Sequence, residues 1–203
     1  MTALEIADFI GIICFALSGF LIAVHYKLDI LGVFISAFLT ALGGGMTRDV
    51  LASKTPYVFT DTLPVILVIA TVIISLILKL HKSDDIEGKT AFIISDAIGL
   101  VSFAITGSLV AIENDFNFLG VLILAFITAV GGGTIRDILI NRVPSILVSE
   151  FYATVAIIVG LITYGLHIFG LRSIPTLIAV FVFGVALRLL AYYKKWHLPT
   201  LSK

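Results

Sequence analysis

Apolar residues occur along this chain in long runs that short polar connectors separate. Each of seven runs is close to the ~20 residues that an α-helix needs to cross the hydrocarbon core of a bilayer. No connector is long enough to form a separate soluble domain. We therefore predict an all-α membrane protein with a single transmembrane domain over residues 1–203. The seven predicted spans are 5–24, 31–51, 63–80, 91–112, 119–140, 146–167 and 174–193.

The composition agrees with this pattern and excludes several function classes. Hydrophobic residues make up 60% of the chain and charged residues only 13%, and the mean hydropathy is +1.17, which is typical of an integral, multi-pass membrane protein. The formal net charge is zero, so a nucleic-acid partner is not expected. The four histidines lack ligand spacing and no catalytic motif is present, so we predict no metal, no cofactor and no enzyme activity.

One sequence unit occurs twice. The segment AFLTALGGGMTRD at 37–49 returns 88 residues later as AFITAVGGGTIRD at 125–137, and the similarity runs without a gap from 8–56 against 96–144. Each copy contains three predicted spans, an odd number, so the second copy must cross the membrane in the opposite sense. Such inverted repeats are common in transport proteins. The predicted units are two inverted three-helix repeats, 5–80 and 91–167, and a seventh helix outside the symmetry, 174–193.

Each copy carries a glycine triplet inside its second span. Three successive glycines each weaken a helix by about 1 kcal/mol relative to alanine, so we expect the second and fifth helices to be kinked and unwound there. The freed carbonyls would then line a cation pathway. The alternative is tight helix packing, because glycine lets two backbones approach closely, and both roles can coexist. The candidate kink residues are Gly43, Gly44, Gly45, Gly131, Gly132 and Gly133.

An Arg-Asp pair follows each triplet. Charge inside an apolar span is costly and usually functional, so Arg48 with Asp49 and Arg136 with Asp137 are candidate pore charges or gating residues at opposite mouths of one pathway. Each arginine would be neutralised by a carboxylate of the same or the opposite repeat. The alternative is that these charges close the helices at the membrane surface.

Other polar residues in the spans recur at equivalent positions. Asp8 is best explained as a carboxylate that stabilises the dipole of its helix, whereas its counterpart Asp96 lies deeper in an apolar segment and can attract cations. Intramembrane hydroxyls more often bond to their own helix than line a pore. The candidate pore-lining residues are Ser18, Thr40, Asp96, Thr106 and Thr128.

The distribution of Lys and Arg predicts the orientation. Ten of the 13 basic residues fall on the side that holds the C-terminus, and basic residues favour the cytoplasmic side. We therefore expect the N-terminus outside and the C-terminus in the cytoplasm.

The doubled Gly-Gly-Gly-x-x-Arg-Asp motif, with Asp-x-x-Gly and Phe-Ala-x-[Ser/Thr]-Gly in the first helix of each unit, resembles the prokaryotic trimeric intracellular cation (TRIC) channel family. The same doubled unit is known among bacterial proteins as a glycine-transporter domain. The resemblance implies a homotrimer in the cell (inner) membrane, in contact with lipids. Each protomer would hold its own potassium-permeable pore, with potassium as the permeant monovalent cation.

Two functions follow from these patterns. The first is a passive cation channel with a pore between the two repeats in each protomer. The second is a small-solute secondary transporter, with glycine as a candidate substrate, in which the repeats rock for alternating access. A non-conducting scaffold does not explain the paired intramembrane arginines.

Overall fold

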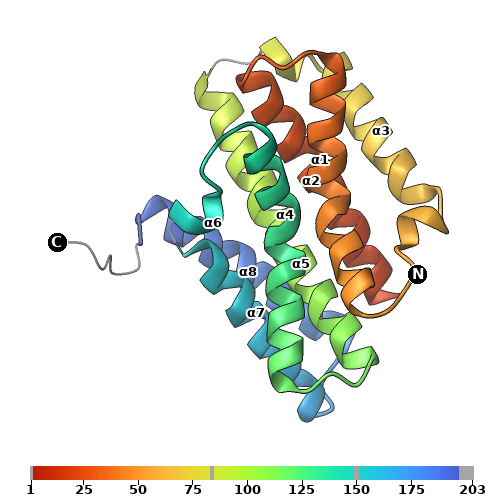
Figure 1. The fold of residues 1–203 in the computed structure, drawn as a ribbon. Helices are drawn as coiled ribbons and strands as arrows, with labels where there is room; N and C mark the ends of the chain where they lie inside the picture. Colours follow the sequence, from red (N-terminus) through yellow and green to blue (C-terminus); the bar gives the residue numbers. More distant parts are fainter. Residues whose placement is uncertain (1, 83–84, 149–150, 197–203) are drawn as a thin grey trace.

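The computed structural model describes residues 2–82, 85–148 and 151–196, and these residues form an all-helical protein (Figure 1). Eight α-helices and two short 3-10 helices, η1 and η2, occur in the described ranges. Their bounds are α1 Ala3–His25, α2 Ile30–Leu51, η1 Tyr57–Phe59, α3 Leu63–Ile77, η2 Leu80–Lys82, α4 Asp85–Glu113, α5 Phe118–Leu139, α6 Ser145–Val148, α7 Tyr152–Ile168 and α8 Ile174–Tyr193.

The helices match the predicted spans in position but differ in length. Five of them are long and apolar enough to cross a membrane, namely α1, α2, residues 90–113 of α4, α5 and α8. Two are shorter, with 15 residues in α3 and 17 in α7. The predicted span 146–167 is divided into α6 and α7, and Phe151 in front of α7 has a left-handed backbone with φ of 48°. Seven full-length spans are therefore not confirmed.

The two repeats adopt the same local structure. Asp29 caps α2 by accepting a hydrogen bond from the Gly32 amide at 2.7 Å, and Asn117 caps α5 through the Gly120 amide at 2.8 Å. Behind α2 and α5, Ser53 and Asn141 both take a left-handed backbone, with φ of 57° and 55°. These pairs are 88 residues apart, so the sequence repeat extends to the caps and turns.

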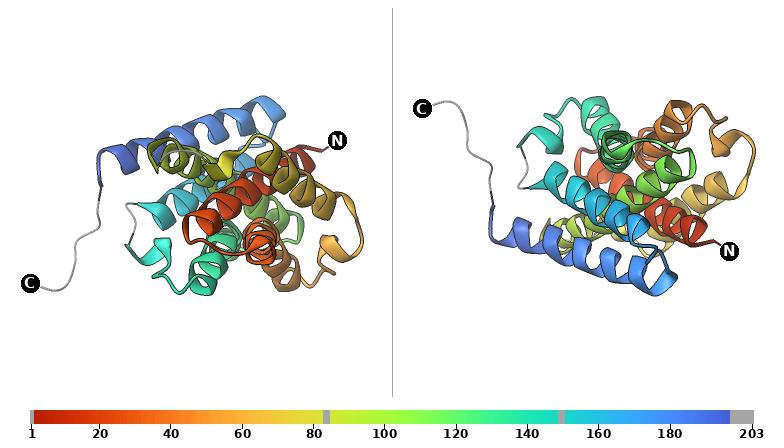
Figure 2. Two further views of the ribbon diagram at one scale, coloured as in Figure 1. Left: turned by 90° about the horizontal axis from the view of Figure 1, so that it is seen from above. Right: turned by 90° about the horizontal axis from the view of Figure 1, so that it is seen from below.

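The two repeats pack against each other through equivalent helices. α1 contacts α4, and α2 contacts α5, while α3 lies on α1 and α2 just as α7 lies on α4 and α5. α2 and α5 run in opposite directions (Figure 1), as inverted repeats require. The end views show α8 along one edge of the molecule (Figure 2), where it contacts α7 and α4. α8 therefore covers the second repeat and has no counterpart on the first.

Equivalent aromatic residues fill the interface between α1 and α4. The Phe15 and Phe103 rings are fully buried and their centroids lie 5.3 Å apart. Each ring packs where the opposite helix carries a glycine, Gly99 for Phe15 and Gly11 for Phe103. The Asp-x-x-Gly spacing of the sequence thus serves the packing of the two repeats.

The glycine triplets do not interrupt their helices. α2 is helical throughout Ile30–Leu51 and α5 throughout Phe118–Leu139, so the expected unwinding is wrong and the kinks are not confirmed. A Cβ on Gly44 would overlap the Thr128 carbonyl oxygen, and a Cβ on Gly132 would overlap the Thr40 carbonyl oxygen. The triplets let the backbones of α2 and α5 touch where the helices cross, and this contact outweighs the low helix propensity of glycine.

We predict that Gly44→Ala and Gly132→Ala each destabilise the protein, because the added methyl group meets backbone that cannot turn away. Overpacking of this kind costs about 1–3 kcal/mol. Thermal unfolding in detergent measures the effect, with Gly165→Ala as the control, since a Cβ there meets nothing within 4 Å. Equal melting temperatures for all three variants would contradict this packing.

Candidate functional site

Arg48 is the centre of a buried ion cluster near the C-terminal end of α2. Its Nη1 donates to both carboxylate oxygens of Asp8 on α1, at 2.8 and 3.0 Å. Its Nε donates to Asp49 at 2.9 Å, and Nη1 also lies 3.2 Å from the hydroxyl of Thr106 on α4. We call these residues (Asp8, Arg48, Asp49 and Thr106) the first cluster.

Arg136 on α5 forms the equivalent arrangement. Its Nη1 donates to Asp96 on α4 at 2.9 Å and to the hydroxyl of Ser18 on α1 at 2.8 Å. Its Nε donates to Asp137 at 3.0 Å, while the Ser18 hydroxyl donates to Asp96 at 3.0 Å. These residues (Ser18, Asp96, Arg136 and Asp137) form the second cluster.

Each cluster takes residues from both repeats. The first cluster draws Asp8, Arg48 and Asp49 from the first repeat and the Thr106 hydroxyl from the second. The second cluster reverses this, since its hydroxyl comes from Ser18 of the first repeat. Ser18 and Thr106 occupy equivalent positions of the repeat, so the inverted symmetry exchanges one hydroxyl for the other.

The clusters lie inside the protein and at different depths. α1 supplies Asp8 to one cluster and Ser18 to the other, and these two residues are separated along the helix by roughly 15 Å at 1.5 Å per residue. That separation is about half of the ~30 Å hydrocarbon core. The arginine residues are 2% and 0% exposed. Neither guanidinium therefore extends along the protein surface to water.

The outer carboxylate of each cluster also fixes the connector that follows the helix. The second oxygen of Asp49 accepts a hydrogen bond from the Tyr57 amide at 3.1 Å, and that of Asp137 accepts one from the Ser145 amide at 2.7 Å. The Tyr57 ring lies 5.6 Å from the Arg48 guanidinium. Burial, and then the charge of Asp8, raises the pKa of the Tyr57 phenol, so its hydroxyl stays neutral. Each connector is thus tied to its charged cluster.

The balance of charge in the clusters favours cations over anions. Each guanidinium contacts two carboxylates, so each cluster carries one formal negative charge in excess. A buried charge without a partner is strongly unfavourable, and paired, hydrogen-bonded charges avoid that penalty. The pairing of each arginine by a carboxylate of its own repeat is the arrangement that the sequence predicted as one of its two alternatives.

The remaining predicted residues take different places. Thr40 and Thr128 donate their hydroxyl groups to the Ser36 and Leu124 carbonyls of their own helices, at 2.5 and 2.6 Å. Sequence reasoning missed Asp8, which it explained by the helix dipole. The signal was present, because Asp8 is the repeat equivalent of Asp96 and an equivalent residue should meet the equivalent arginine.

The alternatives to the clusters are a metal site and an apolar hollow. No group of three or more histidine, cysteine, aspartate or glutamate residues there could hold a metal ion. A hollow of about 270 Å³ on α2 is lined by four apolar side chains, Phe34, Ile35, Phe38 and Leu39. It offers no polar ligand to an ion, so the two clusters are the candidate site.

Comparison with known proteins gives a consistent result. A family model described as "Glycine transporter" matches residues 5–80 and again residues 93–168. The UPF0126 membrane protein YvgT of Bacillus subtilis is 36% identical, over 98% of this chain and 97% of its own length. The UPF0126 inner membrane protein YadS of Escherichia coli K12 is 34% identical, over 96% of this chain and 94% of its own length.

Solved structures are similar over nearly the whole chain. A structure from work on conductance through TRIC cation channels has a TM-score of 0.84 and 37% identity, over 98% of this chain and 97% of that one. A prokaryotic TRIC channel crystallised in 0.5 M KCl has a TM-score of 0.87 and 32% identity, over 96% and 98%. The TRIC trimeric intracellular cation channel orthologue from Rhodobacter sphaeroides has a TM-score of 0.87 and 26% identity, over 96% and 100%.

We predict that Asp8→Asn destabilises the protein strongly, because it leaves Arg48 buried with one carboxylate. Each hydrogen bond to a charged group is worth about 1.5–3 kcal/mol, whereas the loss of a carboxylate that only stabilised the helix dipole would cost about 0.3–1 kcal/mol. Chemical unfolding measures the difference, and Asp115→Asn is the control because Asp115 is exposed. A loss for Asp8→Asn as small as that of the control would refute the pairing.

Proposed function

Since this chain belongs to the TRIC cation channel family, an integral membrane family without enzyme activity, we propose that it conducts monovalent cations, potassium among them. The path runs within each protomer, between the two inverted repeats. Cations cross passively, and no cofactor is required.

The observation that carries this proposal is the pair of symmetric arginine clusters. Ionisable residues buried in a membrane protein are costly and usually mark an ion or substrate pathway. Here each cluster lies where the two repeats meet, and each holds a negative charge in excess that suits a cation. The inverted repeat places one cluster toward each side of the membrane.

In this conformation the arginines close the path. Nη1 of Arg48 spans from Asp8 to Thr106, and Nη1 of Arg136 spans from Asp96 to Ser18, so each side chain connects the two repeats. The direct contact of α2 and α5 at Gly44 and Gly132 fills the interior between the clusters. Opening then requires an arginine to leave its hydroxyl partner in the opposite repeat. A charge that moves in this way responds to membrane potential, by about 2.3 kcal/mol per 100 mV for a full crossing.

The assembly and orientation complete the proposal. The Rhodobacter sphaeroides relative is described as trimeric, and a homotrimer with lipid around it is proposed for this chain. α3 and α7 cross the membrane with the five longer helices. The N-terminus lies outside and the C-terminus in the cytoplasm, as the bias of Lys and Arg favours.

A second candidate function follows from the description of the matching family model as a glycine transporter. In that case the two repeats rock against each other and a small zwitterion binds between the clusters. A guanidinium would hold its carboxylate and an aspartate its ammonium group. Such a carrier gives saturable transport and no unitary currents.

We predict that the purified protein, reconstituted in planar bilayers with a potassium gradient, gives unitary currents that reverse near the potassium equilibrium potential. Arg48→Gln and Arg136→Gln should change the unitary current or its voltage dependence, because each removes a charge from the closed path. Arg172→Gln is the control, since Arg172 is exposed in the connector before α8.

The same preparation separates the two functions. If the protein is a channel, vesicles that contain it should show no saturable uptake of radiolabelled glycine beyond the uptake of protein-free vesicles. Saturable glycine flux without unitary currents would support the carrier and overturn the channel. Currents that neither arginine substitution alters would show that the clusters are not part of the path.

A further inference from the structure

The region of the second cluster contains fully buried polar atoms that have no hydrogen-bond partner. Among the residues that the structure describes, three buried side-chain polar atoms have no hydrogen-bond partner, and two belong to this region. They are Nη2 of Arg136 and the hydroxyl oxygen of Tyr152, the first residue of α7. Both residues are almost fully buried, at 0% and 3% exposure. Buried polar atoms in native proteins are nearly always bonded, so this pair requires an explanation.

The two atoms face the same space, which Gly133 keeps open. A Cβ built on Gly133 would lie 3.3 Å from the Tyr152 hydroxyl oxygen and 3.6 Å from Nη2 of Arg136. The equivalent Gly45 in the first repeat has only the Tyr57 ring carbon at 3.5 Å and Nη2 of Arg48 at 3.9 Å near its Cβ position. Among the described residues, two fully buried polar atoms without a partner thus lie around a glycine only in the second repeat.

The chemistry of the two atoms specifies what fits between them. A guanidinium nitrogen only donates, while a phenol donates or accepts, so the ligand must present oxygen lone pairs to Nη2. Asp96 and Asp137 together outweigh the charge of Arg136, which disfavours an anion, and a donor aimed at the space disfavours a cation. The Tyr152 hydroxyl also interacts with the Asp96 carboxylate, but the two groups do not reach hydrogen-bond geometry. A neutral ligand with two to four polar neighbours is what a buried water needs.

We propose that one water molecule is bound between Nη2 of Arg136 and the hydroxyl of Tyr152, beside Gly133. The water accepts from the guanidinium and bonds the phenol, so Tyr152 is a positioning residue for Arg136. This site does not depend on ion conduction, and its failure would leave the channel proposal standing.

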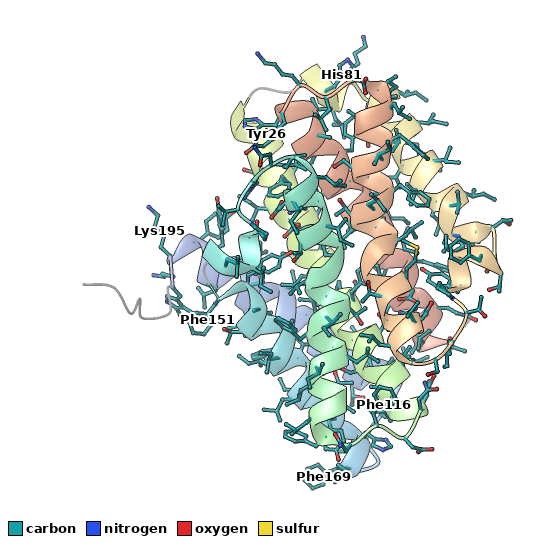
Figure 3. All side chains as sticks on the ribbon, viewed as in Figure 1. Tyr26, His81, Phe116, Phe151, Phe169 and Lys195 are labelled. Atoms are coloured by element: carbon teal, nitrogen blue, oxygen red, sulfur yellow. The ribbon has the colours of Figure 1, made fainter. Side chains whose placement is uncertain are left out.

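The water joins α8 to the second cluster. The guanidinium of Arg188 on α8 lies over the Tyr152 ring at 4.8 Å from its centroid. Figure 3 shows Phe151 and Lys195 on the same side of the molecule, where α7 begins and α8 has ended. The first repeat has Pro64 at the position equivalent to Tyr152. Of the two cluster arginines, Arg136 is thus the one that the water and Tyr152 link to Arg188 of α8, the helix outside the repeat symmetry.

The test is structure determination of the protein in lipid at a resolution that shows ordered water, for the wild type, Tyr152→Phe, Gly133→Ala and the matched control Gly45→Ala. We expect density within about 2.7–3.2 Å of both atoms in the wild type and in Gly45→Ala. Tyr152→Phe and Gly133→Ala should lack it, and the Arg136 guanidinium should be displaced or less ordered. A wild-type structure without that density, with the hydroxyl bonded directly to Asp96, would overturn the site.

A stability measurement on the same variants gives an independent answer. Tyr152→Phe removes one bond to the water and Gly133→Ala displaces it, so the two changes act on the same ligand. The melting temperature of the double variant should be close to that of the less stable single variant. Losses that simply add would contradict a shared water.

Discussion

A guanidinium enclosed in a membrane protein must have its charge balanced inside the protein. Bulk water and lipid headgroups do not reach Arg48 or Arg136, which are 2% and 0% exposed. Each therefore needs a carboxylate from another helix, and Asp8 and Asp96 supply it at 2.8 and 2.9 Å. This pairing fixes α1 against α2 and α4 against α5. The other long helices pack around these two pairs, α3 on the first and α7 and α8 on the second.

α1 and α4 each contribute a side chain to both clusters. Each of them gives a carboxylate to its own cluster and a hydroxyl to the other, so neither cluster is complete without both repeats. At Gly44 and Gly132, the backbones of α2 and α5 touch each other directly, with no side chain between them. The surroundings of the two clusters differ, because Tyr152 of α7 lies near Arg136 and the Arg188 guanidinium of α8 lies over the Tyr152 ring. The two clusters therefore differ in their surroundings although their formal charges are the same.

The sequence predicted the helices and the repeat well, because long apolar runs and an 88-residue self-similarity are unambiguous signals. It failed where tertiary contact decides between alternatives. The helix propensity of Gly43 to Gly45 predicted unwinding, yet contact with α5 keeps α2 helical. Asp8 was assigned to its helix dipole because its partner, Arg48, is 40 residues away. The exchange of Ser18 and Thr106 between repeats could not be predicted without knowing how the repeats face each other.

The central claim is that each arginine is held by both repeats, and double-mutant cycles on unfolding free energy test it directly. Arg48→Gln combined with Thr106→Val, and Arg136→Gln combined with Ser18→Ala, should each show a coupling of about 0.5–3 kcal/mol, as contacting residues do. The crossed combinations, Arg48→Gln with Ser18→Ala and Arg136→Gln with Thr106→Val, should be additive within about 0.5 kcal/mol. Additive losses in the first two combinations would contradict the shared clusters.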